Sequence, residues 1–233
     1  MFKQLYDETS STLTYLITDE DTKEALLIDP VIIHLDEYIA MLEANGYTLK
    51  YSLETHVHAD HITASGLLRE RLHAETAVSQ LCGATTADIQ LNDGDVLLLG
   101  KQKIHVLATP GHTAGSLSFL WNDRLFSGDA LLINGCGRTD FQGGDAIALY
   151  NSIQNKIFSL PDETLIYPGH DYNGRRVSSV AQEKLTNARL AGKSLQEFVQ
   201  TMNSLNLPKP SLIDIAVPAN RKCGVPEEGV VQG

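Results

Sequence analysis

The composition of this chain suits a globular enzyme and excludes several other classes of protein. It has 233 residues, 42% of them hydrophobic, which is enough for one large domain or two small ones. The formal net charge of −11 argues against a nucleic-acid partner, because phosphate backbones bind basic surfaces. No apolar run reaches the roughly 18 residues of a membrane helix, so no membrane partner is expected.

The cysteines and the first residues indicate the compartment. Cys82, Cys136 and Cys223 are odd in number, widely spaced and free of any C-x-x-C motif, which favours reduced thiols over a disulfide framework. Residues 1–8 carry acidic side chains and no long apolar core, so neither a secretory signal nor an Arg-rich transit peptide is expected. These features predict a cytoplasmic protein.

Strand and helix patterns alternate along the chain, without repeats or low-complexity segments. The expected elements are a hairpin of strands 13–18 and 25–30, a helix over 34–43, a strand over 51–53, a helix over 63–72, strands over 74–79, 95–99 and 103–108, a hairpin of 116–121 and 124–126, a helix over 145–160, a strand over 164–167, helices over 178–189 and 195–205, and a proline-containing tail. Strands followed by helices in each half predict an α/β protein in which two sheets are sandwiched between helices. Functional residues should then lie on loops at the strand ends.

One heptapeptide, Thr55-His56-Val57-His58-Ala59-Asp60-His61, carries the strongest chemical signal. It directly follows an apolar run. In extended backbone His56, His58 and Asp60 point to one side, because side chains alternate with period two. Imidazole nitrogen and carboxylate oxygen together suit first-row metals such as zinc and iron. The spacing predicts a metal site in preference to a surface loop that is rich in histidine by chance.

Three later loops share one arrangement: an apolar strand, a glycine-containing turn and a side chain that can bind a metal. The turns are Pro110-Gly111 before His112, Ser127-Gly128 before Asp129, and Pro168-Gly169 before His170. Each turn lifts its side chain out of the sheet. Five of the eight histidines lie in these loops and the heptapeptide, whereas His34, His73 and His105 are expected to be ordinary surface or core residues.

In their order and spacing, these four motifs resemble the metallo-β-lactamase fold superfamily. The resemblance implies an αββα sandwich, in which two mixed β-sheets are flanked by helices and a metal site lies at one edge. A single domain over 1–233 is expected, with 224–233 as a flexible tail. The superfamily includes thioesterases, β-lactamases, nucleases, flavoproteins and oxygenases, so the fold alone does not decide the reaction.

Longer stretches resemble the persulfide dioxygenases, also called sulfur dioxygenases, in a stand-alone form without a fused rhodanese-like domain. These stretches are 54–63, 126–142, 166–172, 187–190, 205–210 and 216–220. The likeness runs from residue 2 to Cys223. It implies oxidation of glutathione persulfide by O2 to sulfite and glutathione, at one non-haem Fe(II) per chain.

The resemblance assigns His56, His112 and Asp129 as the iron ligands and the catalytic centre. Two imidazoles and one carboxylate on one face of Fe(II) leave about three coordination positions open. Both persulfide and O2 need such positions, whereas a redox-inert zinc with a bound hydroxide would hydrolyse an ester or amide. The four remaining residues of this kind are expected to orient ligands and waters. Because all four are present, the sequence leaves a second metal open; they are His58, Asp60, His61 and His170.

An acidic protein with an anionic substrate needs a local basic site. Arg138 follows Asp129 by nine residues in a glycine-rich loop, and Tyr172 follows His170 by two. The resemblance favours both as substrate-binding residues, and Arg189 is a third candidate. Arg175 and Arg176 also follow the His170 loop. A surface ion pair is the alternative role for each arginine. Cys136, in the Arg138 loop, is expected to be a small packing residue.

Two other functions remain open at this stage. A glyoxalase II-type thioesterase would hydrolyse S-acyl glutathione with two metals, and it would share the histidine motif and much of the Gly-Cys-Gly-Arg loop. Its longer helical glutathione-binding part does not match the tail of this chain. A non-catalytic metal-binding or redox-partner protein is disfavoured by the complete set of ligands. The resemblance also favours a homodimer.

Overall fold

The computed structural model describes residues 1–225. Most of the flexible tail predicted over 224–233 therefore lies outside the described residues. Its first two residues are held in a turn, since the Gly224 amide donates to the Ala219 carbonyl at 2.9 Å and the Val225 amide donates to the Lys222 carbonyl at 3.2 Å. Within the described part of the chain, no helix has the length and apolarity that crossing a bilayer requires.

Two mixed six-stranded sheets form the centre of the molecule, as the sequence predicted. The first sheet has the strand order β1 (Phe2–Tyr6), β2 (Leu13–Thr18), β3 (Glu24–Ile28), β4 (Thr48–Leu53), β5 (Glu75–Ser79) and β6 (Ile89–Leu91). The second has the order β12 (Ser178–Ser179), β11 (Leu165–Pro168), β10 (Arg124–Gly128), β9 (Leu117–Trp121), β8 (Gln102–Ala108) and β7 (Val96–Leu99). Strands β3 to β6 run parallel, as do β10 and β11, and the other neighbours are antiparallel.

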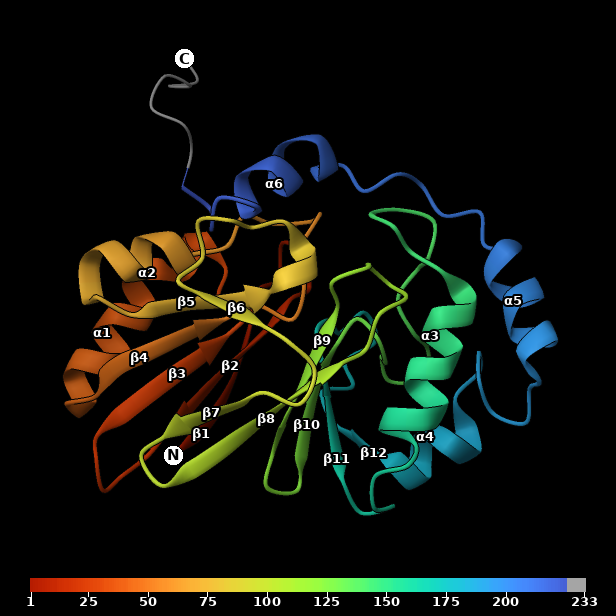
Figure 1. Ribbon diagram of the computed structural model, residues 1–233, viewed down its shortest axis with the longest axis horizontal. Coiled ribbons are helices and arrows are strands. Elements are labelled where there is room, and N and C mark those ends of the chain that lie inside the picture. Colours follow the sequence, from red (N-terminus) through yellow and green to blue (C-terminus); the bar gives the residue numbers. More distant parts are fainter. Residues whose placement is uncertain (226–233) are drawn as a thin grey trace.

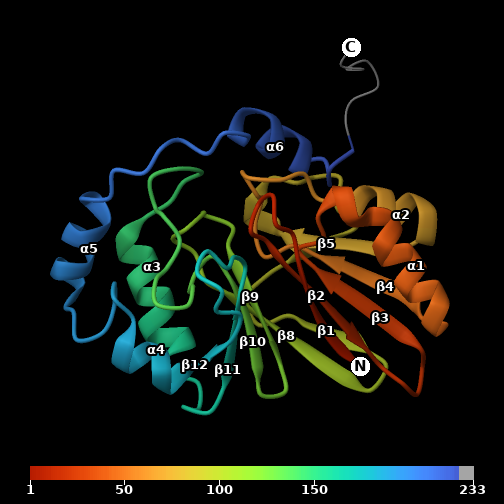
Figure 2. The same cartoon turned by 180° about the vertical axis from the view of Figure 1, so that it is seen from behind.

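Helices cover both outer faces and complete the αββα sandwich (Figures 1 and 2). The first sheet carries α1 (Leu35–Asn45) and α2 (Ser65–Leu72), and the second carries α3 (Ala146–Ser152), α4 (Val180–Thr186) and α5 (Leu195–Asn203). Single turns form η1 (Ile32–His34), η2 (Gln80–Cys82) and η3 (Ile153–Ile157). A last helix, α6 (Ile213–Asn220), lies across one end of the sandwich, near the loops that leave both sheets (Figure 1).

Side-chain alternation along β2 explains how the layers pack. Leu13, Tyr15 and Ile17 belong to the apolar core between the two sheets, which also contains Phe119 of the second sheet. Leu16 points the opposite way and packs in the core beneath α1 and α2. Because successive side chains of a strand face opposite sides, one strand contributes to two cores. A third core lies between the second sheet and α3 to α5.

Four details of the predicted elements were wrong or missing. β1 and β6 were not predicted, because the residues of β1 are only half-buried and β6 has three residues. Residues 178–179 form an edge strand paired with β11, since the Ser179 side chain caps α4 and the helix begins at Val180. The helix predicted over 145–160 ends as α3 at Ser152 and continues as the wider turn η3. The proline-containing tail includes α6, with Pro218 inside it.

The helix α6 matters because it fastens the histidine loop. The Asn220 side chain is 6% exposed. Its Nδ2 donates to the carbonyls of His58 at 2.9 Å and His61 at 2.8 Å, and its Oδ1 accepts from the Thr63 amide at 2.9 Å. Three hydrogen bonds from one side chain therefore set the backbone path of residues 58–63, although they are distant from Asn220 in sequence.

Replacing Asn220 by alanine should loosen this loop. Leaving buried loop carbonyls and an amide without a partner costs about 1–3 kcal/mol per group, so Asn220→Ala should lower the free energy of unfolding measured in urea. Amide hydrogen exchange should also accelerate in residues 58–63. Asn203→Ala, at the exposed end of α5, is the matched control and should change neither quantity. If amide exchange in residues 58–63 were equally slow in Asn220→Ala and the unaltered protein, the Asn220 hydrogen bonds would not be what holds this loop.

Candidate metal centre

Four loops meet at one edge of the sandwich, each beginning where a strand ends. They follow β4, β8, β10 and β11 and carry the heptapeptide, His112, Asp129 and His170. Hydrogen bonds join the loops: the Leu117 amide donates to the Thr55 carbonyl at 2.7 Å, and the Gly169 amide donates to the Gly128 carbonyl at 2.8 Å. The loops that the sequence singled out therefore lie together at the strand ends, where functional residues were expected.

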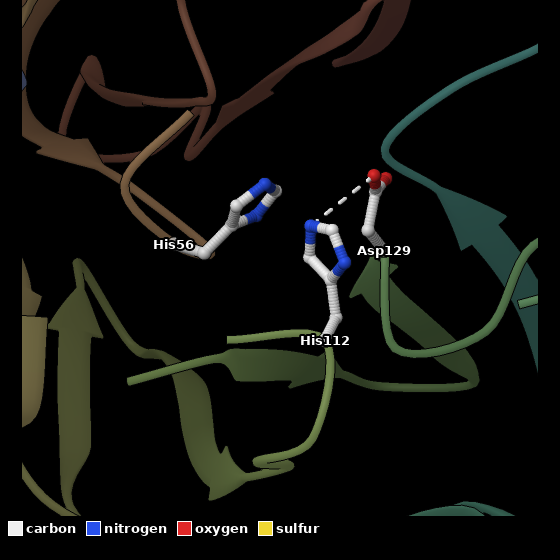
Figure 3. A group of neighbouring side chains, drawn as sticks. All are labelled: His56, His112 and Asp129. Atoms are coloured by element: carbon white, nitrogen blue, oxygen red, sulfur yellow. Dashed lines mark ion pairs between the residues drawn. The ribbon is translucent and has the colours of Figure 1, made fainter. Parts of the chain in front are cut away.

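His56, His112 and Asp129 point into one common space (Figure 3). One donor atom from each lies within 4.8 Å of the other two, a spacing at which a single ion can touch all three. His34, His73 and His105 lie outside this group, as expected: His34 contacts Asp7 and Glu37, and the other two are at the end of α2 and on β8.

Two glycines make room for these ligands. Gly128 has a φ of +51°, and a Cβ there would lie 2.7 Å from the Thr55 side chain. A Cβ on Gly137 would lie 2.7 Å from Nδ1 of His112. Both contacts are too short for any larger residue without movement of a ligand or its support. The glycine before Asp129 and the second glycine of Gly-Cys-Gly thus have a steric cause.

A chain of hydrogen bonds determines the tautomer of His56. Thr55 lies between two partners: its hydroxyl donates to Oδ2 of the fully buried Asp29 at 2.8 Å, and its Oγ1 lies 2.9 Å from Nδ1 of His56. Because the Thr55 hydroxyl donates its single proton to Asp29, Oγ1 can only accept from His56. Nδ1 of His56 is therefore the donor in the hydrogen bond to Thr55. Nε2 then keeps its lone pair. Burial, with the charges of His58 and His112 nearby, lowers the pKa of His56 well below its ordinary value and favours this neutral form.

His112 is held in the same way by a different partner. Its Nδ1 lies 2.7 Å from the Arg138 carbonyl, which can only accept a hydrogen bond, so Nδ1 carries the proton. The free nitrogen, Nε2, lies 3.6 Å from Oδ2 of Asp129. In both histidines Nδ1 is thus used as a donor to the protein, and Nε2 is the nitrogen that remains for a metal.

His170 supports the third ligand. Its Nδ1 lies 2.7 Å from Oδ1 of Asp129, and its Nε2 lies 3.0 Å from Oδ2 of Asp60. Burial alone would lower the pKa of His170, but the charges of Asp129 and Asp60 and the hydrogen bonds to them raise it well above its ordinary value. Both nitrogens therefore donate. His170 restrains one Asp129 oxygen and leaves Oδ2 facing His112.

The two remaining histidines of the heptapeptide point toward other carboxylates. Nε2 of His58 lies 3.1 Å from Oδ1 of Asp29 and 3.2 Å from Oε2 of Glu54. Nδ1 of His61 lies 3.0 Å from Oδ2 of Asp60. Donor atoms also lie within 4.8 Å of one another in two further groups. One group is His58, Asp60 and His61, and the other is Asp29, Glu54 and His58. Proximity alone thus leaves the number of metals open.

Sequence reasoning missed Asp29 and Glu54, which support the site from beneath it. Both are buried. The position of each in the sequence could have indicated its role. Asp29 directly follows the apolar run of β3, and Glu54 directly precedes the heptapeptide. A charged residue at the end of a buried strand indicates a partner at the same sheet edge.

A cavity of about 540 Å³ opens over the three ligands. His58 and His61 are absent from its wall, whereas the predicted substrate-binding residues Arg138, Tyr172 and Arg189 all line it. Cys136 also borders the cavity, but it packs in the third core beside Met202. Burial raises the pKa of the Cys136 thiol to about 11, which keeps it protonated and agrees with a packing role.

The three predicted substrate-binding residues differ in their partners. Arg138 forms a bidentate pair with Asp140, with both N···O distances at 2.7 Å, and it also donates to the carbonyls of Leu207 and Pro208. Arg189 donates to the Cys136 carbonyl and forms no ion pair among the described residues. Tyr172 is 64% exposed and stacks on His170 at a centroid distance of 5.5 Å.

Breaking the hydrogen-bond chain behind His56 should weaken metal binding. Thr55→Val keeps the side-chain shape but removes the hydroxyl that orients the imidazole, and losses of about 10- to 100-fold in metal affinity are typical of such changes. Competition with a chromophoric chelator measures that affinity without any turnover. Thr186→Val, on the exposed surface of α4, is the control. Equal affinity in Thr55→Val and the unaltered protein would show that the chain of hydrogen bonds has no such role.

Comparison with known proteins agrees with this geometry. Residues 8–81 and 83–170 match the model of the metallo-beta-lactamase superfamily. The chain is 49% identical over 228 residues to the protein named persulfide dioxygenase ETHE1, mitochondrial, from Homo sapiens, covering 97% of this chain and 89% of that protein. The protein of the same name from Mus musculus is 47% identical with the same coverage.

Solved structures give the same result. The crystal structure of ETHE1 from Myxococcus xanthus superposes with a TM-score of 0.95 at 56% identity, covering 97% of this chain and all of that one. A metallo-beta-lactamase from Staphylococcus aureus has a TM-score of 0.86 at 31% identity, covering 95% of this chain and 71% of that one. The chain therefore belongs to the metallo-β-lactamase superfamily and, within it, to the family of the ETHE1 persulfide dioxygenases.

Proposed function

We propose that this chain is a persulfide dioxygenase, which oxidises the terminal sulfur of glutathione persulfide with O2 and water to sulfite and glutathione at one non-haem Fe(II). The near-complete alignment with persulfide dioxygenases at 49% identity carries this proposal. The geometry supports it, because two imidazoles and one carboxylate converge at the cavity while the neighbouring ligand-type residues contact other protein groups.

The residues present fit a ferrous ion. His56 and His112 would each bind through Nε2, since Nδ1 is used toward the protein, and Asp129 through Oδ2, a donor set typical of non-haem Fe(II) oxygenases. When bound, such an ion supplies open positions at which a sulfur donor and O2 can react. Burial raises the pKa of Asp129, but the nearby imidazoles, His170 first among them, bring it below its ordinary value, so the carboxylate is charged.

The remaining residues of the chain prepare the site and hold the substrate. His170 keeps Asp129 in one orientation, and Asp60 holds His170 in turn. We propose that Arg189 and Tyr172 contact the glutathione part, since both line the cavity and neither is tied to a carboxylate among the described residues. The hydrogen bonds of Arg138 to Asp140 and to two carbonyls favour a bracing role, which holds residues 207–208 against the cavity wall.

We propose a single iron because His170 uses both ring nitrogens on carboxylates and because His58 and His61, although each keeps a buried nitrogen without a hydrogen-bond partner in the described part of the chain, do not line the cavity. His58 lies between Asp29 and Glu54. Anaerobic loading followed by metal analysis should give about one ferrous ion per chain. Asp129→Ala should lose most of that iron. A stoichiometry near two, with a magnetically coupled pair of ions, would contradict the single-iron proposal and favour the glyoxalase II-type alternative.

Two assays run in parallel test the reaction itself. The iron-loaded protein should consume O2 when glutathione persulfide is added and should not hydrolyse S-lactoylglutathione. His56→Ala and Asp129→Ala should abolish O2 uptake, because each removes a metal ligand. His105→Ala, on the exposed side of β8, is the control that should retain it. Hydrolysis without O2 uptake would establish the thioesterase, and neither activity would favour a non-catalytic metal-binding protein.

Two further proposals concern the setting of the enzyme. Cys82, Cys136 and Cys223 are all buried free thiols, which suits a reducing compartment such as the cytoplasm. The Homo sapiens and Mus musculus relatives are named mitochondrial, so fractionation of the source cells would decide this point. The homodimer stays a prediction, which light scattering of the purified protein would test.

A further inference from the structure

Three arginines line the cavity, and they differ in what already binds them. Arg138 is paired with Asp140, and Arg189 donates to the Cys136 carbonyl. Within residues 1–225, the Arg175 guanidinium has no hydrogen bond and no ion pair. It is therefore a cation on the cavity wall with all five donors available.

The backbone beneath Arg175 is well anchored. Asp171 is 5% exposed, and its Oδ1 accepts from the amides of Asn173 and Arg175, both at 2.9 Å. The Asp171 amide donates to the Ser11 carbonyl at 3.0 Å. Gly174, with a φ of +72°, allows the tight turn between them. The position from which Arg175 extends is thus set by buried contacts, although the side chain itself is solvated.

The next residue provides an internal comparison. The guanidinium of Arg176 lies 4.5 Å from the centre of the Tyr6 ring, and its Nε lies 3.7 Å from Oδ2 of Asp171. Arg176 does not line the cavity. Two adjacent arginines therefore have opposite situations: one is engaged by the protein away from the cavity, and the other faces the cavity unengaged.

The cavity wall needs such a cation for an anionic substrate. Asp60, Asp129 and Asp171 all contribute to it, and the protein as a whole is acidic. Glutathione carries two carboxylates. An unpaired guanidinium can bind a carboxylate through two parallel hydrogen bonds, which compensates the repulsion from the aspartates.

Building on the proposed function, we propose that Arg175 binds one carboxylate of the glutathione carrier and makes the enzyme selective for anionic persulfides. Arg189, which forms no ion pair within residues 1–225, lines the same cavity and is available for the second carboxylate. Arg175 is then a specificity-determining residue that acts on substrate affinity and leaves the reacting sulfur untouched.

Kinetics of O2 uptake separate this role from a structural one. Arg175→Ala should raise KM for glutathione persulfide by about 10- to 100-fold, the loss expected for a charge-assisted hydrogen bond, with kcat little changed. Arg175→Lys keeps the positive charge but cannot form two parallel hydrogen bonds, so its affinity for glutathione persulfide should lie between those of Arg175→Ala and the unaltered protein. Arg176→Ala is the matched control and should leave KM unaltered.

A substrate with masked carboxylates tests the selectivity directly. The unaltered enzyme should have a higher kcat/KM for glutathione persulfide than for the persulfide of glutathione diethyl ester. In Arg175→Ala this acid-to-ester ratio of kcat/KM should fall by the factor by which KM for glutathione persulfide rises. An unchanged KM and an unchanged acid-to-ester ratio in Arg175→Ala, while the unaltered protein still consumes O2, would overturn the role of Arg175 and leave the proposed function standing.

Calorimetry keeps the two proposals separable if no persulfide is oxidised. Anaerobic titration of glutathione into the iron-loaded protein should show weaker binding to Arg175→Ala than to Arg176→Ala. That result would support the Arg175 site even if the absence of O2 uptake had refuted the dioxygenase. Equal binding to the two variants would overturn the Arg175 site on its own.

Discussion

The position of the proton on each histidine ring is the constraint on which this site depends. A metal binds the nitrogen that carries no proton, and a buried imidazole has its tautomer chosen by the partner of its other nitrogen. For His56 that partner is the Thr55 hydroxyl, which is itself committed to the buried Asp29. For His112 it is the Arg138 carbonyl. The two rings are thus oriented by a hydroxyl that a buried carboxylate holds and by a backbone carbonyl.

Charge pairing divides seven similar residues into ligands and supports. Burying several carboxylates and imidazoles together is costly unless each charge has a partner. His170 lies between Asp129 and Asp60, and His58 lies beside Asp29 and Glu54. These contacts compensate the buried charge, and those of His170 occupy both of its ring nitrogens. The same interactions therefore stabilise the polar edge and favour His56, His112 and Asp129 as the proposed ligands.

Segments remote from the heptapeptide complete the site. Asn220 of α6 binds the backbone of residues 58–63, and the loop that follows β11 supplies Tyr172 and Arg175 to the cavity wall. Arg138 joins the loop after Asp129 to residues 207–208. The proposed metal ligands follow the strands β4, β8 and β10, whereas the other side chains of the cavity wall come from longer loops and from the C-terminal region. The proposal thus assigns chemistry and specificity to different parts of the fold.

The sequence by itself determined the superfamily, the order of most strands and helices, and the ligand-type residues, because these follow from local patterns: side-chain alternation, glycine turns, and histidines at fixed spacing. Spacing alone could not separate proposed ligands from supports, and only the resemblance did so, because His56 and His58 occupy equivalent positions in the motif and differ in their contacts: Thr55 with Asp29 for one and Glu54 with Asp29 for the other. Sequence reasoning also missed α6, and it could not show that Arg138 is paired with Asp140 whereas the Arg175 guanidinium has no partner among residues 1–225. Only the tertiary structure decided those points, because burial and hydrogen-bond partners depend on residues brought together from across the chain, and no local pattern encodes them.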